Sequence, residues 1–126
     1  MLSLPPSVRV FIATQPVDGR KGADSLMVIV RDVFGHDPFC GHLFVFFSRR
    51  TDRVRIVYWD RSGFAMWTKR LERGRFRPGF SSDGALTASA IEAAELALIV
   101  EGIDLTGARR RARWQPTGRA HATLNP

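Results

Sequence analysis

Three short β-forming runs follow one another in the middle of the chain, and they constrain the fold more than any other feature. The runs are GHLFVFFS, RVRIVYWD and GFAMWTKRLE, and the turn-like tetrapeptides RRTD and DRSG separate them. Strands that are joined by turns this short pair with their neighbours in antiparallel fashion. The pattern therefore predicts a three-stranded antiparallel meander between residues 41 and 72.

The residues on either side of the meander predict one further strand and two helices. SVRVFIAT, residues 7–14, alternates in the manner of a strand. Apolar stripes predict a helix over residues 18–34 and a second over residues 89–101, where Ser89 and Glu92 have the spacing of a capping box. The expected fold class is α+β, with a small antiparallel sheet of about four strands, in β-α-β-β-β-α order, packed by two helices.

The length and composition favour a single domain. With 126 residues, of which 44% are hydrophobic, the chain can bury one modest core. We expect one α+β domain over residues 1–116 and a disordered tail over residues 117–126, where periodicity is absent. No apolar run approaches the roughly 20 residues of a membrane span, and a single cysteine allows no internal disulfide. We therefore expect a cytoplasmic protein without membrane contact.

Positive charge is concentrated in one segment. The formal net charge is +7, and residues 49–77 hold ten basic residues against three acidic ones, so this segment alone carries the net charge of the whole chain. A local excess of this size indicates binding to a polyanion, with nucleic acid as the first expectation.

The middle run combines arginines with aromatic residues. On a strand, Arg53, Arg55 and Trp59 share one face. We expect the arginines to be exposed, because arginine is rarely buried without a partner. Trp59 would offer a stacking surface for bases, although burial in the core is the commoner fate of a tryptophan in a small sheet. The predicted nucleic-acid-binding residues are Arg49, Arg50, Arg53, Arg55, Trp59, Lys69, Arg70, Arg73 and Arg75.

A second basic site is expected at the start of the first helix. Arg20 and Lys21 would fall in the first helical turn, where the helix dipole disfavours cations. They could hold a phosphate beside the free amide groups of the helix start. Equally, Asp18 and Asp24 could simply neutralise them, and the sequence leaves both alternatives open.

No pattern in the chain supports catalysis or a cofactor. His36, Cys40 and His42 lie close together in sequence, but a fourth zinc ligand is missing and the spacing matches no zinc motif. The candidate carboxylates stand mostly at turn and cap positions, which aspartate favours for local hydrogen bonds. These carboxylates are Asp18, Asp24, Asp52, Asp60 and Asp83. We expect no metal, no cofactor and no enzymatic activity.

Three stretches resemble a known family. VRVFIATQPVDGRKGADSL, DPFCGHLFVFFSRRTDRVRIVYWDRSGFAMWTKRLERGRF and LIVEGIDL are similar to the TnpB-type accessory protein, the second open reading frame product, of bacterial insertion sequences of family sixty-six. The matching positions are Asp18, Arg20, Lys21, Gly22, Gly41, His42, Trp59, Asp60, Lys69, Arg70, Leu71, Glu72, Gly74 and Phe76. The resemblance covers about residues 4–116. It departs at Gly19, where a hydrophobic residue is usual, at Cys40, where serine is common, and in the tail beyond Pro116.

The resemblance implies a bacterial protein that is encoded beside a DDE transposase and assists transposition without a catalytic triad of its own. Together with the basic segment, it predicts a non-catalytic accessory protein in DNA transposition that binds nucleic acid through a basic aromatic β-hairpin surface. The alternative is a protein-interaction adaptor that docks on the transposase through the same surface without binding DNA. Salt separates the two, because phosphate binding weakens steeply as salt rises.

Overall fold

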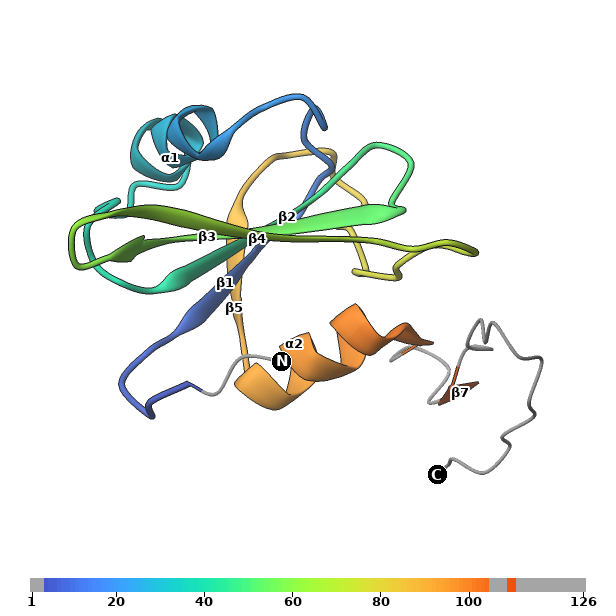
Figure 1. Cartoon of the computed structure of the whole chain (residues 1–126). Coiled ribbons are helices and arrows are strands. Elements are labelled where there is room, and N and C mark those ends of the chain that lie inside the picture. The colour runs from blue at the N-terminus through green and yellow to red at the C-terminus, as the bar shows by residue number, and fades with distance from the viewer. Residues whose placement is uncertain (1–3, 105–108, 111–126) are drawn as a thin grey trace.

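A mixed five-stranded sheet lies between two helices, with α1 on one face and α2 on the other (Figure 1). The computed structural model describes residues 4–104 and 109–110, so the expected tail over residues 117–126 lies outside the described residues. The elements in chain order are β1 (Val10–Ala13), α1 (Ala23–Asp32), β2 (Leu43–Phe47), β3 (Arg53–Asp60), β4 (Gly63–Arg70), β5 (Ala88–Ile91), α2 (Ala93–Glu101), β6 (Ile103–Asp104) and β7 (Arg109–Arg110). β6 and β7 pair with each other in a separate two-stranded ribbon. Within the described part of the chain, neither helix has the length and apolar character needed to cross a membrane.

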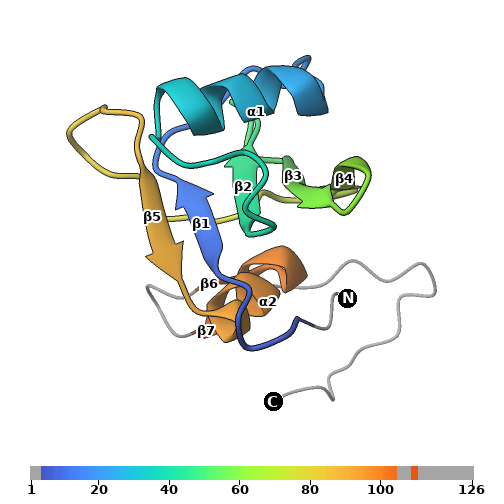
Figure 2. The same cartoon turned by 90° about the vertical axis from the view of Figure 1, so that its left-hand side faces the viewer.

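The sheet has the strand order β4-β3-β2-β1-β5 (Figure 2). β2, β3 and β4 form the predicted antiparallel meander, and the α+β prediction is confirmed. β1 and β2 are the parallel exception, with Val10 opposite Leu43. They run in the same direction because α1 carries the chain back to the end of the sheet at which β1 began. The sheet therefore has one parallel pair where only antiparallel pairs were expected, and five strands where about four were expected.

The fifth strand comes from a segment that was predicted to be helical. Residues 88–91 form β5 and pair antiparallel with β1 over four residues. The predicted helix start at Ser89 is wrong, because the outer edge of β1 supplies backbone hydrogen-bond partners that local propensity does not anticipate. α2 begins at Ala93, and its capping box forms between Glu92 and Glu95, three residues later than expected.

α1 starts later than predicted. The helix begins at Ala23, after Gly22, and has no side-chain cap. The predicted start at Asp18 is wrong, because its carboxylate accepts hydrogen bonds from the backbone and side chain of Arg20 in a turn that precedes the helix. Beyond the other end of the helix, Gly35 has a φ of +71°, the left-handed conformation that glycine adopts without strain.

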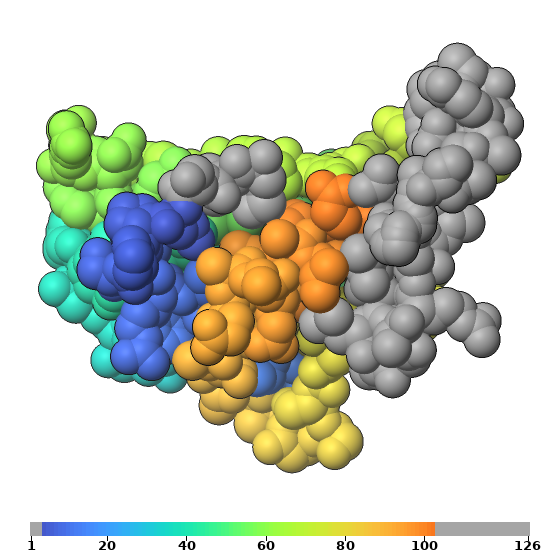
Figure 3. All heavy atoms as spheres, turned by 90° about the horizontal axis from the view of Figure 1, so that it is seen from below, coloured from blue at the N-terminus to red at the C-terminus, as the bar shows by residue number. Residues whose placement is uncertain are grey.

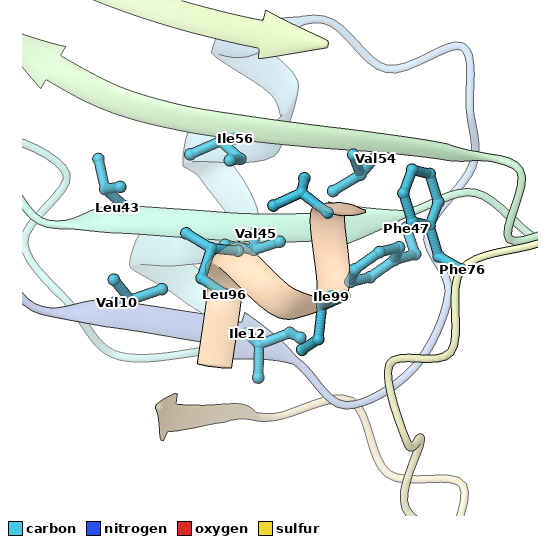
Figure 4. Packing of buried hydrophobic residues seen from close by; sticks show 11 residues of the cluster. Val10, Ile12, Leu43, Val45, Phe47, Val54, Ile56, Phe76, Leu96 and Ile99 are labelled. Atoms are coloured by element: carbon cyan, nitrogen blue, oxygen red, sulfur yellow. The ribbon is translucent and has the colours of Figure 1, made fainter. Parts of the chain in front are cut away.

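Each face of the sheet packs against one helix and forms its own core. The core on the α2 face includes Val45, Phe47, Val54, Ile56, Leu96, Ile99 and Val100 (Figure 4). The core on the α1 face includes Leu26, Met27, Val30, Phe44, Phe46 and Val57. All five residues of β2 are buried, because alternate side chains of this central strand enter the two cores. β3 pairs with β2 along one edge and with β4 along the other, and the turns at the strand ends lie at the surface.

Candidate nucleic-acid interface

Three basic segments from different parts of the sequence meet at one end of the sheet, on the right in Figure 1. They are the loop 18–21 before α1, the turn 48–52 between β2 and β3, and the segment 71–77 after β4. Leu71 N–H donates to Asp52 O at 2.8 Å and Phe76 N–H donates to Thr51 O at 2.7 Å, which joins the segment to the turn. We call the exposed and half-buried cations here the basic end: Arg20, Lys21, Arg49, Arg50, Arg53, Arg70, Arg73, Arg75 and Arg77.

A shallow hollow of about 290 Å³ lies between the loop 18–21 and the turn 48–52. Its charged lining consists of four arginines and two carboxylates: Arg20, Arg49, Arg50, Arg53, Asp18 and Asp52. Both carboxylates already accept hydrogen bonds, from Arg20 and from the Ser48 hydroxyl (3.2 Å) respectively. No ion pair in the described part of the chain involves the other three arginines. The hollow therefore combines a net positive charge with guanidinium groups that form no ion pair with a carboxylate of the described residues.

Most of the predicted nucleic-acid-binding residues have exposed side chains at the basic end: Arg49, Arg50, Arg70, Arg73 and Arg75. Arg53 is half-buried and lies directly opposite Arg70 in the β3–β4 pair. Like charges that face each other across a strand pair repel, and a bound anion would relieve this repulsion. A contact of these residues with DNA stays a prediction.

Arg55 is the exception, because its side chain is buried. It is 4% exposed, and its guanidinium donates to the backbone oxygens of Lys21 at 3.0 Å and Asp18 at 3.4 Å. Burial lowers the pKa of Arg55, and the nearby charge of Arg53 lowers it further. A Cβ at Gly19 would lie 3.0 Å from Nη2 of Arg55, so the glycine lets the loop lie close to the guanidinium. The expectation that Arg55 is exposed is wrong, since it holds the loop 18–21 against the sheet.

Lys69 lies on the opposite face of the sheet from Arg70. It pairs with Val54, whose side chain belongs to the core on the α2 face. Its Nζ donates to Val100 O at 2.9 Å, where the last carbonyl groups of α2 lack partners within the helix. The ammonium group therefore stabilises the end of α2, and we do not count Lys69 in the basic end.

The predicted basic aromatic surface is divided between the two ends of the sheet. Trp59 lies opposite Phe64 beside the β3–β4 turn, and the stretch of β3 from Arg53 to Trp59 spans about 20 Å. The Trp59 ring packs edge-on against Phe39, with ring centroids 4.9 Å apart, and against Phe64 at 5.1 Å. We call Phe39, Trp59 and Phe64 the aromatic end. Trp59 shares a face with Arg53, as predicted, but lies too far from it for both to contact one phosphate.

Arg20 and Lys21 precede α1 and do not occupy its first turn. Arg20 forms a two-armed ion pair with Asp18, with Nε 3.3 Å from Oδ1 and Nη2 3.2 Å from Oδ2. Hydrogen bonds from the side chain and the backbone of Arg20 lower the pKa of Asp18 to about 2. Asp18 thus neutralises the charge of Arg20, whereas the side chain of Lys21 is exposed to solvent. A phosphate-binding role for these two cations stays a prediction.

His36 and His42 make packing or backbone contacts, whereas Cys40 is exposed. His42 Nδ1 accepts the backbone N–H of Arg9 at 3.0 Å, and both imidazole rings pack against Phe11. The Cys40 thiol is free and exposed. Across the residues that the structure describes, no three side chains of metal-binding type gather into a site.

A larger hollow, of about 760 Å³, lies where the N-terminal segment meets β5 and the start of α2. Figure 3 looks onto this side of the molecule, with the N-terminal segment in blue and α2 in orange. Its charged lining residues are Arg9, Glu92 and Glu95. Because this lining carries more negative than positive charge, the hollow does not suit a polyanion, and the basic end is the candidate site.

The basic end includes residues that the sequence did not connect. The loop 18–21 and the turn 48–52 are far apart in the chain, and no local pattern links them. Two features of the sequence point to the basic end. The arginines on one face of RVRIVYWD require either solvent or a hydrogen-bonding partner, and Arg77 continues the basic series that begins with Arg73 and Arg75.

Comparison with known proteins places the chain in a family. The family described as IS66 Orf2-like protein, TnpB_IS66, matches residues 8–110. The uncharacterized protein y4jC of Sinorhizobium fredii (strain NBRC 101917 / NGR234) is 43% identical over 110 residues, which cover 87% of this chain and 92% of y4jC. The uncharacterized protein y4hO of the same strain is 38% identical over 117 residues, which cover 93% of this chain and 97% of y4hO. No solved structure matches the chain significantly. The chain therefore belongs to the IS66 Orf2-like family, whose members are accessory proteins of insertion sequences.

Proposed function

We propose that this protein is a non-catalytic accessory factor in DNA transposition that binds the phosphate backbone of DNA with its basic end. One observation carries the proposal: Arg49, Arg50 and Arg53 line a hollow and have no carboxylate partner among the described residues. Family membership supports the role in transposition. The charge of residues 49–77 supports nucleic acid as the ligand.

The chemistry of the basic end suits phosphate. The planar guanidinium of arginine can donate two parallel hydrogen bonds to phosphate oxygens. The cations stand on the loop 18–21, the turn 48–52, the segment 71–77 and the adjoining ends of β3 and β4, and no helix presents them for insertion into a groove. Such contacts position a protein on the backbone and read no base edges. Sequence preference is therefore expected to be weak, and affinity is expected to fall steeply as salt rises.

The aromatic end favours a second candidate function, docking on the transposase of the same element. Phe39 is 58% exposed and Met66 is 41% exposed, and the half-buried Trp59 packs against Phe39. Aromatic residues and methionine are enriched where proteins bind one another, and tryptophan is prominent among the residues that contribute most affinity. Since the aromatic end and the basic end are separate, one molecule has room for both contacts.

The test compares two double variants that remove the same charge. Arg49→Gln with Arg50→Gln removes two cations of the hollow, whereas Arg31→Gln with Arg61→Gln removes two exposed arginines outside the basic end. Binding to labelled DNA is measured by fluorescence anisotropy across a salt series. The first pair is expected to lower affinity about tenfold or more and to reduce the slope of log affinity against log salt by about two. The second pair is expected to leave the slope unchanged.

Equal losses in the two double variants would show that overall charge, and not the basic end, controls binding. A different outcome is that the unaltered protein fails to bind DNA at low salt and yet binds the transposase at every salt concentration. That result would favour docking on the transposase over DNA binding. The same reactions supplied with Mg²⁺ are expected to show no strand cleavage.

A further inference from the structure

We infer that the basic end is built for duplex DNA and discriminates against single strands. The inference rests on the proposed DNA binding and concerns the strandedness of that ligand. It follows from the positions of the aromatic rings relative to the cations. Proteins that bind single strands combine a basic groove with aromatic side chains on which successive bases stack.

The rings nearest the basic end face inward. Phe47 and Phe76 are 1% and 2% exposed, and their ring centroids lie 5.6 Å apart in the core on the α2 face. Phe80 packs on Phe47 at 6.3 Å and is half-buried. Within the described residues, the basic end therefore offers no open ring face to an unpaired base.

The remaining aromatic candidates lie elsewhere. Trp59 is about 20 Å along β3 from Arg53, and its edge-on contacts with Phe39 and Phe64 already occupy part of its surface. Tyr58 and Trp67 pack against the core on the α2 face, behind the sheet from Arg53. The third tryptophan, Trp114, lies outside the described residues. Phosphate contact and base stacking are thus not available together at the hollow.

The backbone segments that carry the cations of the basic end are also held in place. Two backbone hydrogen bonds fasten the segment 71–77 to the turn 48–52, and the buried Arg55 fastens the loop 18–21 to β3. An array of cations on a fastened backbone matches a duplex, whose phosphates are themselves fixed and dense, with about one charge per 1.7 Å of helix axis. A flexible single strand would lose conformational freedom on the same array, without the stacking that normally offsets this loss.

The experiment measures duplex and single-stranded DNA of the same sequence, each about 20 nucleotides long, by fluorescence anisotropy with the full chain. The duplex is expected to bind about tenfold tighter or more at moderate salt. Trp59→Leu and Phe39→Ala, each checked for folding by circular dichroism, are expected to change neither affinity more than about twofold, because neither ring stacks on a base. Arg49→Gln with Arg50→Gln is expected to lower duplex affinity about tenfold or more.

Equal or tighter binding of the single strand would overturn the inference while leaving DNA binding intact. A loss of more than about twofold in the single-strand affinity of either folded aromatic variant would also overturn it. Failure to bind either form at low salt would instead overturn the proposed function itself.

Discussion

Arg53 and Arg55 stand two positions apart on one face of β3, yet they have different environments. Arg53 lines the hollow and is half-buried, whereas Arg55 lies beneath the loop 18–21 and donates to its backbone. A buried guanidinium is tolerated only when hydrogen bonds replace the water that it has lost. Arg55 is therefore a structural residue that positions Arg20 and Lys21.

Arg55→Gln is expected to lower the free energy of unfolding by about 2 kcal/mol, because two part-buried carbonyl groups lose a charged donor. Arg53→Gln is the matched control and is expected to change it by less than about 0.5 kcal/mol. Urea unfolding followed by circular dichroism measures both. Equal effects of the two substitutions would contradict the structural role of Arg55.

Asp18 gives the protein a specific acid response. Its pKa is about 2 in the folded state, against 3.8 for an unperturbed aspartate, because Arg20 stabilises the carboxylate. A lowered folded-state pKa means that this contribution to stability is present above about pH 4 and is lost as the pH falls toward about 2. Asp18→Asn, measured by urea unfolding over this range, is expected to flatten the decline. Arg20→Gln should flatten it similarly, and an unchanged decline in both variants would refute the assignment.

At the scale of elements, the segment 71–77 shows how an irregular stretch is kept in place. It contains no helix or strand, but Phe76 inserts into the core beside Phe47, and its N–H donates to Thr51 O. The burial of one ring therefore positions the neighbouring Arg73 and Arg75. The basic end depends on the hydrophobic core through this anchor.

Phe76→Ala is expected to lower the free energy of unfolding by about 3 kcal/mol, because it removes a ring that is fully buried in the core. It should also weaken DNA binding, since Arg73 and Arg75 lose their fixed positions. Phe39→Ala is the control, because that ring is 58% exposed, and its cost should stay below about 1 kcal/mol. Unfolding and anisotropy measurements on both variants test the anchor, and unchanged DNA affinity in a folded Phe76→Ala protein would contradict it.

At the scale of the molecule, the sheet separates two kinds of charge and two kinds of surface. Residues 78–104 carry acidic side chains and no basic ones, and α2 with its Glu92, Glu95 and Glu101 belongs to this stretch. The basic residues gather at the end of the sheet that holds the β2–β3 turn and the last residue of β4, whereas the aromatic end lies beside the β3–β4 turn. A polyanion is therefore attracted to one end of the sheet and repelled from α2, which favours a single orientation on DNA.

Local patterns in the sequence predicted the meander, the existence of both helices, the face shared by Arg53, Arg55 and Trp59, and the segment that carries the charge. These features follow from local periodicity and from turn residues, which act over a few positions. The three-dimensional fold was needed to show that β5 pairs with β1, that Arg55 is more deeply covered than Arg53, and that Lys69 contacts α2. Alternation along a strand specifies the face of a side chain, but its depth depends on what packs over that face. At β3 the cover is the loop 18–21. This loop belongs to the connection from β1 through α1 to β2, which is distant from β3 in the sequence.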